Sequence, residues 1–519
     1  MRLANGYAVE DMQGVEKYIH DVWRSVSREF PPEFKYEGWR RCTHQEEYRE
    51  AVRKRTTRPM YDIARSDFFM VRYDFSFEGK LMKPKFIYLP SITENCTIHI
   101  SNGRYLVSPV LADRVISIGM DYVFVRLLRD KMTFEKLQHH IKVGGVRETV
   151  NVLWSQVYHK NATQKKIKNP LNLKCAIAHY LFCKYGFTET LQRFGKTNPV
   201  VGDNTNIDTN LYPEDKWVIL SSNQTQPRNY GFGPWAPSQL KIAIRREEFT
   251  PMVKNLIGGL FYVVDHFPEQ FHEPSNVESP QLWLFLMGQI NFSPLVSRGK
   301  LINDMTNHIA SLDDYIDSIM IDKFKEIDRP ITDLYQLFAM LIENFDPWLR
   351  ENADKVNSMY DKELNVIGFL LETLTFLIVK MNFRLKAAAK KGLKQRDVES
   401  ALQSVKTGAL FGLVKTSGCL STTTSPGDNK AFKLTTILIP QTASQKGVGG
   451  KDRGAADDPT KRLHISVAEN GGYSMIPKAA PDGRGRLNGH SRVSPSGQLL
   501  RHEDLRPMLD GVETQIKRL

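Results

Sequence analysis

Apolar residues follow two different periods in this chain, and the change between them limits the possible folds. From Phe68 to Phe77 aromatic and polar residues nearly alternate, as on a strand with one buried face. Between residues 249 and 415 almost every segment has apolar residues at the spacing of an amphipathic helix. The two patterns predict an α+β fold, with a mixed helical and antiparallel β region on the N-terminal side and an all-helical C-terminal domain.

The dipeptide Asn102-Gly103 is the sharpest local signal, because it separates two strand-like runs at 96–101 and 104–107. Asn-Gly supplies the positive φ angles that both central residues of a type I′ turn require. We therefore expect a hairpin whose turn is centred on this dipeptide. Further strands are predicted at 85–89, 115–118, 122–127, 216–221 and 240–245.

Helices are predicted in three places outside the 249–415 region. The first 60 residues are highly charged and helix-like. Residues 133–158 are predicted as a helix with an interruption near Gly144, and residues 171–185 as a second helix that stops at Gly186.

The most apolar run of the chain, Leu364–Phe383, is predicted as part of a buried core helix that continues to residue 385. The run contains Asn365, Glu372 and Lys380, whereas a bilayer span needs about 20 residues with few or no charges. We therefore expect no membrane partner.

At 519 residues the chain exceeds the size of one hydrophobic core, so we expect two or three domains. Beyond residue 416 small, polar and charged residues dominate, and such segments bury too little apolar surface to order by themselves. Two apolar islands there, Leu434–Ile439 and Leu463–Val467, could still add strands. The predicted segments are 1–66, charged and helical; 67–248, α+β; 249–416, helical; and 417–519, a basic Gly/Pro/Ser-rich and largely flexible tail.

An excess of positive charge predicts a polyanionic partner. Lys and Arg total 71 against 58 acidic residues, for a formal charge of +13, and such a chain attracts nucleic acid, either DNA or RNA. An evenly spread basic surface is the alternative. Four basic clusters are the predicted nucleic-acid-binding residues: Arg49, Arg53, Lys54, Arg55 and Arg58; Lys165, Lys166 and Lys168; Lys386, Lys390, Lys391, Lys394 and Arg396; Arg484 and Arg486.

Five cysteines are scattered without a CxxC pair, which indicates a reducing compartment rather than a disulfide framework. Cys175, His179 and Cys183 recur every four residues on one face of the predicted helix 171–185. Cys175 and Cys183 would lie about 12 Å apart, too far to share one metal ion. We therefore expect a buried stripe.

Asp313, Asp314 and Asp317 form the pattern DDxxD at the start of a predicted helix over 313–326. The pattern is similar to the aspartate-rich motif of isoprenyl-diphosphate and terpene synthases, where carboxylates one helical turn apart hold magnesium ions that bind a diphosphate. The similarity covers five residues, and the sequence has no second aspartate-rich motif. It implies a Mg²⁺ site at these carboxylates; an acidic helix N-terminus favoured by the helix dipole is the alternative.

Asp265 and His266 begin a second polar cluster that extends to Glu273. Carboxylate and imidazole groups at this density are typical of a metal or acid/base site. Against this, Pro268 prevents one continuous helix, and the HExxH spacing is absent. Polar residues at a helix end are the alternative.

The segments Arg104–Ser117 and Val123–Arg129 resemble large uncharacterised proteins of tailed bacteriophages, as do Tyr262–Pro268 and Tyr360–Leu364. The resemblance includes no motif with a known function, so it transfers no functional residue. It implies a role in genome handling or in the virion, after expression in a bacterial cytoplasm.

These observations favour a non-enzymatic phage protein, without a cofactor, that binds nucleic acid or assembly partners, including further copies of itself. It would act in the host cytoplasm or as a virion component. The alternative is a magnesium-dependent enzyme acting on nucleic acid or a phosphorylated substrate. That enzyme would use Asp313, Asp314 and Asp317, or Asp265 and His266.

Overall fold

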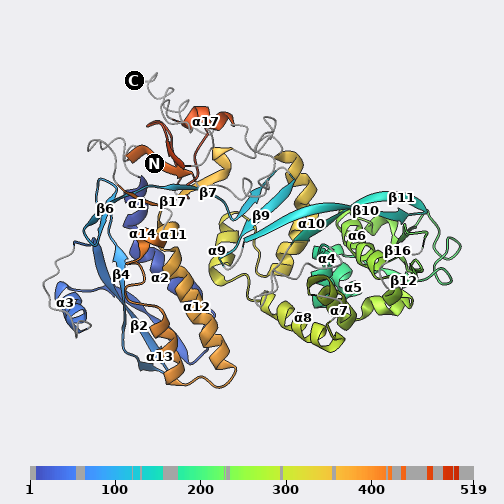
Figure 1. The fold of residues 1–519 in the computed structure, drawn as a ribbon, viewed down its shortest axis with the longest axis horizontal. Coiled ribbons are helices and arrows are strands. Elements are labelled where there is room, and N and C mark those ends of the chain that lie inside the picture. Colours follow the sequence, from blue (N-terminus) through green and yellow to red (C-terminus); the bar gives the residue numbers. More distant parts are fainter. Residues whose placement is uncertain are drawn as a thin grey trace, which may run out of the picture. The chain divides into compact units, whose positions relative to one another are not determined.

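The computed structural model of this chain divides into two compact units, residues 1–117 with 354–519, and residues 118–353 (Figure 1). The α+β prediction is confirmed. The domain boundaries predicted at residues 66, 248 and 416 differ from the boundaries of these two units, which lie after residues 117 and 353. The predicted domains stay a prediction. The structure describes residues 7–53, 65–119, 121–128, 131–155, 173–226, 228–229, 234–292, 296–352, 358–416, 419–422, 434–439, 464–471, 483–494 and 496–501.

The first unit is built on an antiparallel sheet that one helix covers. Strand β2 (Phe68–Phe77) pairs with β1 (Phe34–Arg41) on one side and with β3 (Lys80–Leu81) and β4 (Lys85–Pro90) on the other. Helix α2 (Val15–Ser27) follows α1 (Tyr7–Gln13), and its fully buried Trp23 contacts the rings of Tyr73 and Phe75 on β2. The prediction that the first 60 residues are helical is wrong over β1, whereas α3 (His44–Arg53) is a helix as expected.

The predicted hairpin is present in the first unit, with its turn one residue earlier than expected. Strands β5 (Thr97–Ile100) and β6 (Gly103–Val107) pair antiparallel, and Ile100 faces Gly103 across the turn. The two central residues are therefore Ser101 and Asn102, with φ of 48° and 70°. Asn102 takes the second turn position, and Gly103 opens the returning strand.

Segments from the C-terminal part of the chain complete two sheets of the first unit. Strand β18 (Leu420–Thr422) pairs with β6, and β19 (Thr436–Ile439) lies between β7 (Val110–Asp113) and β20 (Gly483–Arg486). The strand predicted for the apolar island at 434–439 is therefore confirmed. The island at 463–467 instead enters a short helix, α17 (Ile465–Asn470).

The apolar run at 364–383 does not form one helix in the first unit. Its start belongs to strand β17 (Lys362–Asn365), which pairs with β7. Helices then follow as α11 (Ile367–Leu370), α12 (Glu372–Ala389), α13 (Gln395–Ser404) and α14 (Leu413–Thr416). No helix in the described ranges has the length and apolarity that crossing a bilayer would require.

The second unit is built on a larger antiparallel sheet, and here the helix predicted at 133–158 is wrong. The chain forms the long strands β10 (Lys131–Val143) and β11 (Val146–Ser155), joined at Gly144 and Gly145 with φ of 56° and 81°. This glycine pair supplies the same type I′ turn angles as Asn-Gly. The other strands are β8 (Ile116–Ile118), β9 (Tyr122–Arg126), β12 (Val200–Gly202), β13 (Trp217–Ser222) and β16 (Lys241–Arg245), beside a separate pair, β14 (Arg228–Asn229) and β15 (Pro234–Trp235).

Helix α6 (Pro251–His266) packs closely against this sheet on one side and against the helix that contains Ala178 on the other, because the glycine at each contact lacks a side chain. A Cβ on Gly258 would lie 2.6 Å from Val150 of β11, and one on Gly259 would lie 2.6 Å from Ala178. The remaining helices of the unit are α4 (Ile177–Tyr185), α5 (Phe187–Thr190), α7 (Pro280–Asn291), α8 (Arg298–Leu312), α9 (Ser318–Glu326) and α10 (Leu334–Glu351).

The side chains of Cys175, His179 and Cys183 are buried, as predicted. His179 and Cys183 lie on α4, and Cys175 lies just before it. His179 Nε2 donates to the carbonyl of Trp283 at 2.8 Å. Burial lowers the pKa of His179 to about 4 and raises the pKa of Cys175 to about 12. These groups are neutral core residues near pH 7.

Candidate nucleic-acid interface

The helical hairpin formed by α12 and α13 ends in a group of basic residues that we name the basic tip. Helix α12 ends at Ala389, the chain turns at Gly392 with φ of 85°, and α13 starts at Gln395. Asp397 fixes this start, because its carboxylate accepts a hydrogen bond from the backbone N of Lys394 at 3.2 Å. The two helices lie side by side in Figure 1. The basic tip comprises Lys380, Arg384, Lys386, Lys390, Lys391, Lys394 and Arg396.

Packing on the opposite faces of these helices holds the basic tip in place. Leu374, Ile378 and Leu385 of α12 are fully buried, and α12 contacts α2 as well as α13. On α13 the buried positions are Val398, Ala401 and Leu402. The apolar face fixes the helix orientation, so the basic side chains point outward.

Most charges of the basic tip have no ion-pair partner among the residues that the structure describes. Lys386 is the exception, since its Nζ lies 2.7 Å from the carboxylate of Glu29. The other six side chains are exposed, and none of them has an ion pair with any residue that the structure describes. No acidic residue occurs in the sequence from 373 to 396. The tip is therefore a region of concentrated positive potential.

The structure describes every residue of this predicted basic cluster, but only part of the other three. Arg49 is exposed on α3, and Arg486 is half-buried in β20, where it pairs with Thr436. The side chains of Arg53 and Arg484 are not described. Lys54, Arg55, Arg58, Lys165, Lys166 and Lys168 lie outside the described residues.

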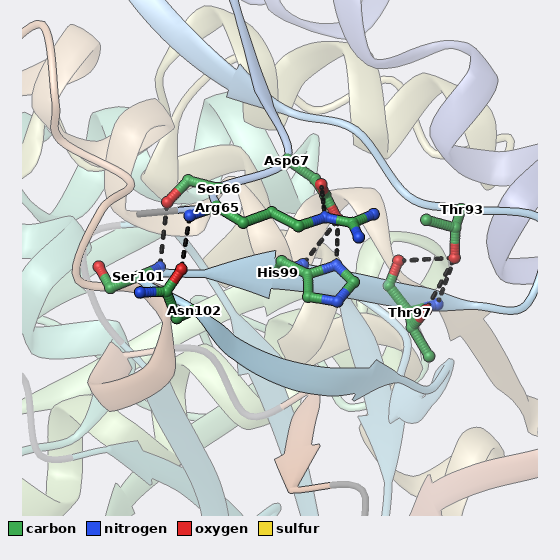
Figure 2. Close-up of polar contacts among 8 residues, drawn as sticks. All are labelled: Arg65, Ser66, Asp67, Thr93, Thr97, His99, Ser101 and Asn102. Carbon is green, nitrogen blue, oxygen red and sulfur yellow. Dashed lines mark hydrogen bonds and ion pairs between the residues drawn. The ribbon is translucent and has the colours of Figure 1, made fainter. Parts of the chain in front are cut away.

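A cluster of polar contacts in the first unit holds residues 65–67 against the hairpin of β5 and β6 (Figure 2). The carboxylate of Asp67 accepts from the backbone N of His99 at 2.8 Å and from its Nδ1 at 2.7 Å. Arg65 Nε donates to the other carboxylate oxygen at 3.4 Å. The contacts orient His99, and they use both oxygens of Asp67.

Backbone contacts extend this attachment to the turn of the hairpin. Asn102 Oδ1 accepts from the backbone N of Arg65 at 2.6 Å, and the backbone N of Asn102 donates back to the Arg65 carbonyl at 3.0 Å. Ser66 Oγ accepts from the backbone N of Ser101 at 3.0 Å. Figure 2 also shows Thr97, the first residue of β5, bonded to Thr93 in the segment before this strand. These contacts fix residues 65–67 to the hairpin of β5 and β6.

The surroundings of Asp67 favour its charged form. Partial burial raises the pKa of Asp67, but the hydrogen bonds from His99 and Arg65 outweigh burial and lower it below its usual value. Sequence reasoning missed this cluster, because its residues come from separate segments with no motif spacing.

The acidic pattern at 313–317 lies in a turn between α8 and α9 rather than on a helix. Asp313 Oδ1 and Oδ2 accept from Lys184 Nζ, both at 2.8 Å. Asp317 is 4% exposed and caps α9, where its Oδ1 accepts from the backbone N of Ile319 and of Met320 at 3.0 Å. The premise of carboxylates one helical turn apart is therefore wrong, and a Mg²⁺ site at Asp313, Asp314 and Asp317 stays a prediction.

The side chains of Asp265 and His266 bond to different partners, and that of Asp265 bonds to the sheet. Asp265, only 2% exposed, accepts from His139 Nε2 of β10 at 2.9 Å and from Ser222 Oγ of β13. His266 Nδ1 instead donates to the carbonyl of Tyr262 within α6, at 2.5 Å. The network links helix α6 to two strands, and acid/base chemistry at Asp265 and His266 stays a prediction.

Within the ranges that the structure describes, no three His, Cys, Asp or Glu side chains converge as metal ligands would. Among the predicted site residues that the structure describes, Lys390, Lys391, Lys394 and Arg396 of the basic tip are exposed and have no ion pair with a described residue.

Comparison with known proteins identifies the family. The model of the non-virion RNA polymerase subunit family matches residues 5–508. This match spans nearly the whole chain, so the protein belongs to that family, a family of phage proteins. A search of curated proteins gives no match.

Family membership corrects the function predicted from the sequence. The phage origin and the nucleic-acid partner agree with the family, whose complex acts on DNA. The prediction of a non-enzymatic genome-handling protein or virion component is wrong, because the chain is a subunit of a nucleotidyltransferase complex that is not part of the virion. Its partners are other polymerase subunits and the DNA template, which the sequence suggested only as nucleic acid and assembly partners.

Proposed function

We propose that this subunit contributes a nucleic-acid-binding surface to the polymerase, and that the basic tip of α12 and α13 is that surface. The supporting observation is that six exposed Lys and Arg side chains share one helical hairpin and have no ion-pair partner among the described residues. Such side chains bind phosphate groups and release counterions, so binding weakens as salt rises. The basic tip contacts the phosphates of the nucleic acid, so its binding does not depend on the base sequence.

The test is a triple substitution, Lys390→Ala, Lys391→Ala and Lys394→Ala, in the full chain. Binding to a labelled DNA is measured by fluorescence anisotropy over a salt series. We expect weaker binding, and a log Kd against log salt slope that is smaller by roughly 0.7 to 0.9 for each phosphate that the variant no longer neutralises.

A matched control removes three positive charges elsewhere: Lys80→Ala, Lys83→Ala and Lys300→Ala, all at exposed positions without an ion pair among the described residues. The control should leave the slope nearly unchanged. An equal decrease in affinity in both triple variants would mean that net charge, and not the tip, governs binding. An unchanged affinity in the tip variant would refute the proposal.

A further inference from the structure

The outward face of α12 carries an aromatic ring in line with the basic tip. Phe376 is 44% exposed, although most large apolar side chains of the unit are buried. It is followed on the same helical face by Lys380 and Arg384, at steps of four residues, and both are exposed. The opposite face of α12 provides the buried contacts, so Phe376 is not needed for this packing.

The ring of Phe376 is available to a partner. Among the residues that the structure describes, it has no aromatic or cation–π contact. Phe411 shows the contrast, because it is 49% exposed but contacts the rings of Phe68 and Tyr88 at 5.3 Å and 5.1 Å. Exposed apolar side chains are common one at a time. What distinguishes Phe376 is that Lys380 and Arg384 of the basic tip follow it on the same helix face.

We infer that this face of α12 binds single-stranded nucleic acid, with a base stacked on Phe376 and the phosphates held by Lys380, Arg384 and the rest of the basic tip. An aromatic platform beside a basic track is the arrangement that binds unpaired strands without sequence preference. A duplex cannot use the ring, because its bases are already stacked on each other. The inference rests on the proposed function and specifies its substrate.

The dimensions of the face suit a short run of nucleotides. Phe376 and Arg384 are separated by eight residues, or about 12 Å along the helix axis. Stacked nucleotides of one strand are spaced at roughly 3.4 Å, so this part of the face spans about three to four of them. Residues 373–396 contain no acidic side chain, and the nearest carboxylates in the sequence are those of Glu372, one helical turn before Phe376, and of Asp397 at the start of α13. An acidic protein segment would also meet the positive charge but would not need an exposed aromatic ring.

The experiment compares Phe376→Ala, Phe376→Leu and Phe376→Trp in the full chain. The probes are a labelled 20-nucleotide oligo(dT) and a duplex of the same length, at one salt concentration. We expect Phe376→Ala and Phe376→Leu to weaken oligo(dT) binding roughly 5- to 100-fold. Duplex affinity should stay within about twofold, and Phe376→Trp should keep wild-type affinity for oligo(dT), because the larger ring still stacks.

The possible failures can be told apart. If Phe376→Ala binds oligo(dT) like the wild type while the triple lysine variant does not bind, this inference is wrong and the proposed function stands. If neither variant changes binding, both are wrong. If Phe376→Ala keeps its nucleic-acid affinity but no longer co-purifies with the other polymerase subunits, the ring is a protein contact and the inference is overturned.

Discussion

The basic tip of α12 and α13 and the carboxylates at 313–317 are both charged clusters that stand out in the sequence, but the fold uses their charges differently. Lys184 pairs with Asp313, and Asp317 is buried as the cap of α9. In the basic tip six of seven side chains are exposed without an ion pair among the described residues. A charge already bonded within the chain stabilises the fold, whereas a charge left exposed is available to a partner.

Asp265 is the buried charge whose removal should destabilise the fold most, because it bonds to two strands of the sheet. Replacing it with Ala leaves His139 and Ser222 without their acceptor in a buried site. We expect the opening of α6 to become easier by about 3 kcal/mol, measured by hydrogen exchange of its backbone amides. Nucleic-acid affinity should not change. A stable Asp265→Ala protein whose polymerase has lost activity would instead assign Asp265 a catalytic role.

Asp317→Ala should have a smaller effect, because it removes a helix cap rather than a buried network. We expect α9 to lose about 1 kcal/mol of stability, while Asp317→Asn, which is also a good cap, loses less. The measurement is hydrogen exchange of α9 with and without Mg²⁺. Stabilisation by Mg²⁺ in the wild type that disappears in Asp317→Asn would show that the carboxylate holds a metal.

Asp67 is an intermediate case, partly exposed and bonded to His99 (Figure 2). Because its folded pKa is lowered, its stabilising effect is complete above the unfolded pKa of about 3.9 and is lost as pH falls through the folded pKa. We expect the His99 amide to lose about 1 kcal/mol or less of protection between pH 6 and pH 3. Asp67→Asn should lack this pH dependence in hydrogen exchange. The same dependence in both proteins would mean that another group causes it.

Local patterns in the sequence predicted much of the fold but not all of it. The hairpin at 97–107 was found because turn chemistry is local, although its centre shifted by one residue from Asn102-Gly103 to Ser101-Asn102. Strands β10 and β11 were missed even though Gly144-Gly145 is also a type I′ turn signal. A pattern that fits both helix and strand is settled by pairing with the preceding strand β9 and with β13, which is distant in sequence.

The candidate site was predicted only in part. The run Lys386 to Arg396 was recognised from its composition, but Lys380 and Phe376 were not assigned to it. Their spacing of four residues was the available signal, and it becomes informative only when the buried face of α12 is known. Asp265 was noticed, but its partners His139 and Ser222 come from strands far away in the chain.

The sequence alone determined the α+β class, the excess of positive charge and the residues able to carry it, because these follow from composition and local periodicity. The tertiary structure decided which charges remain available. Lys386 forms an ion pair with Glu29, and Asp313 forms one with Lys184. The six exposed residues of the basic tip have no ion-pair partner among the described residues. Ion pairing and burial depend on side chains brought together from distant segments, which no local pattern contains.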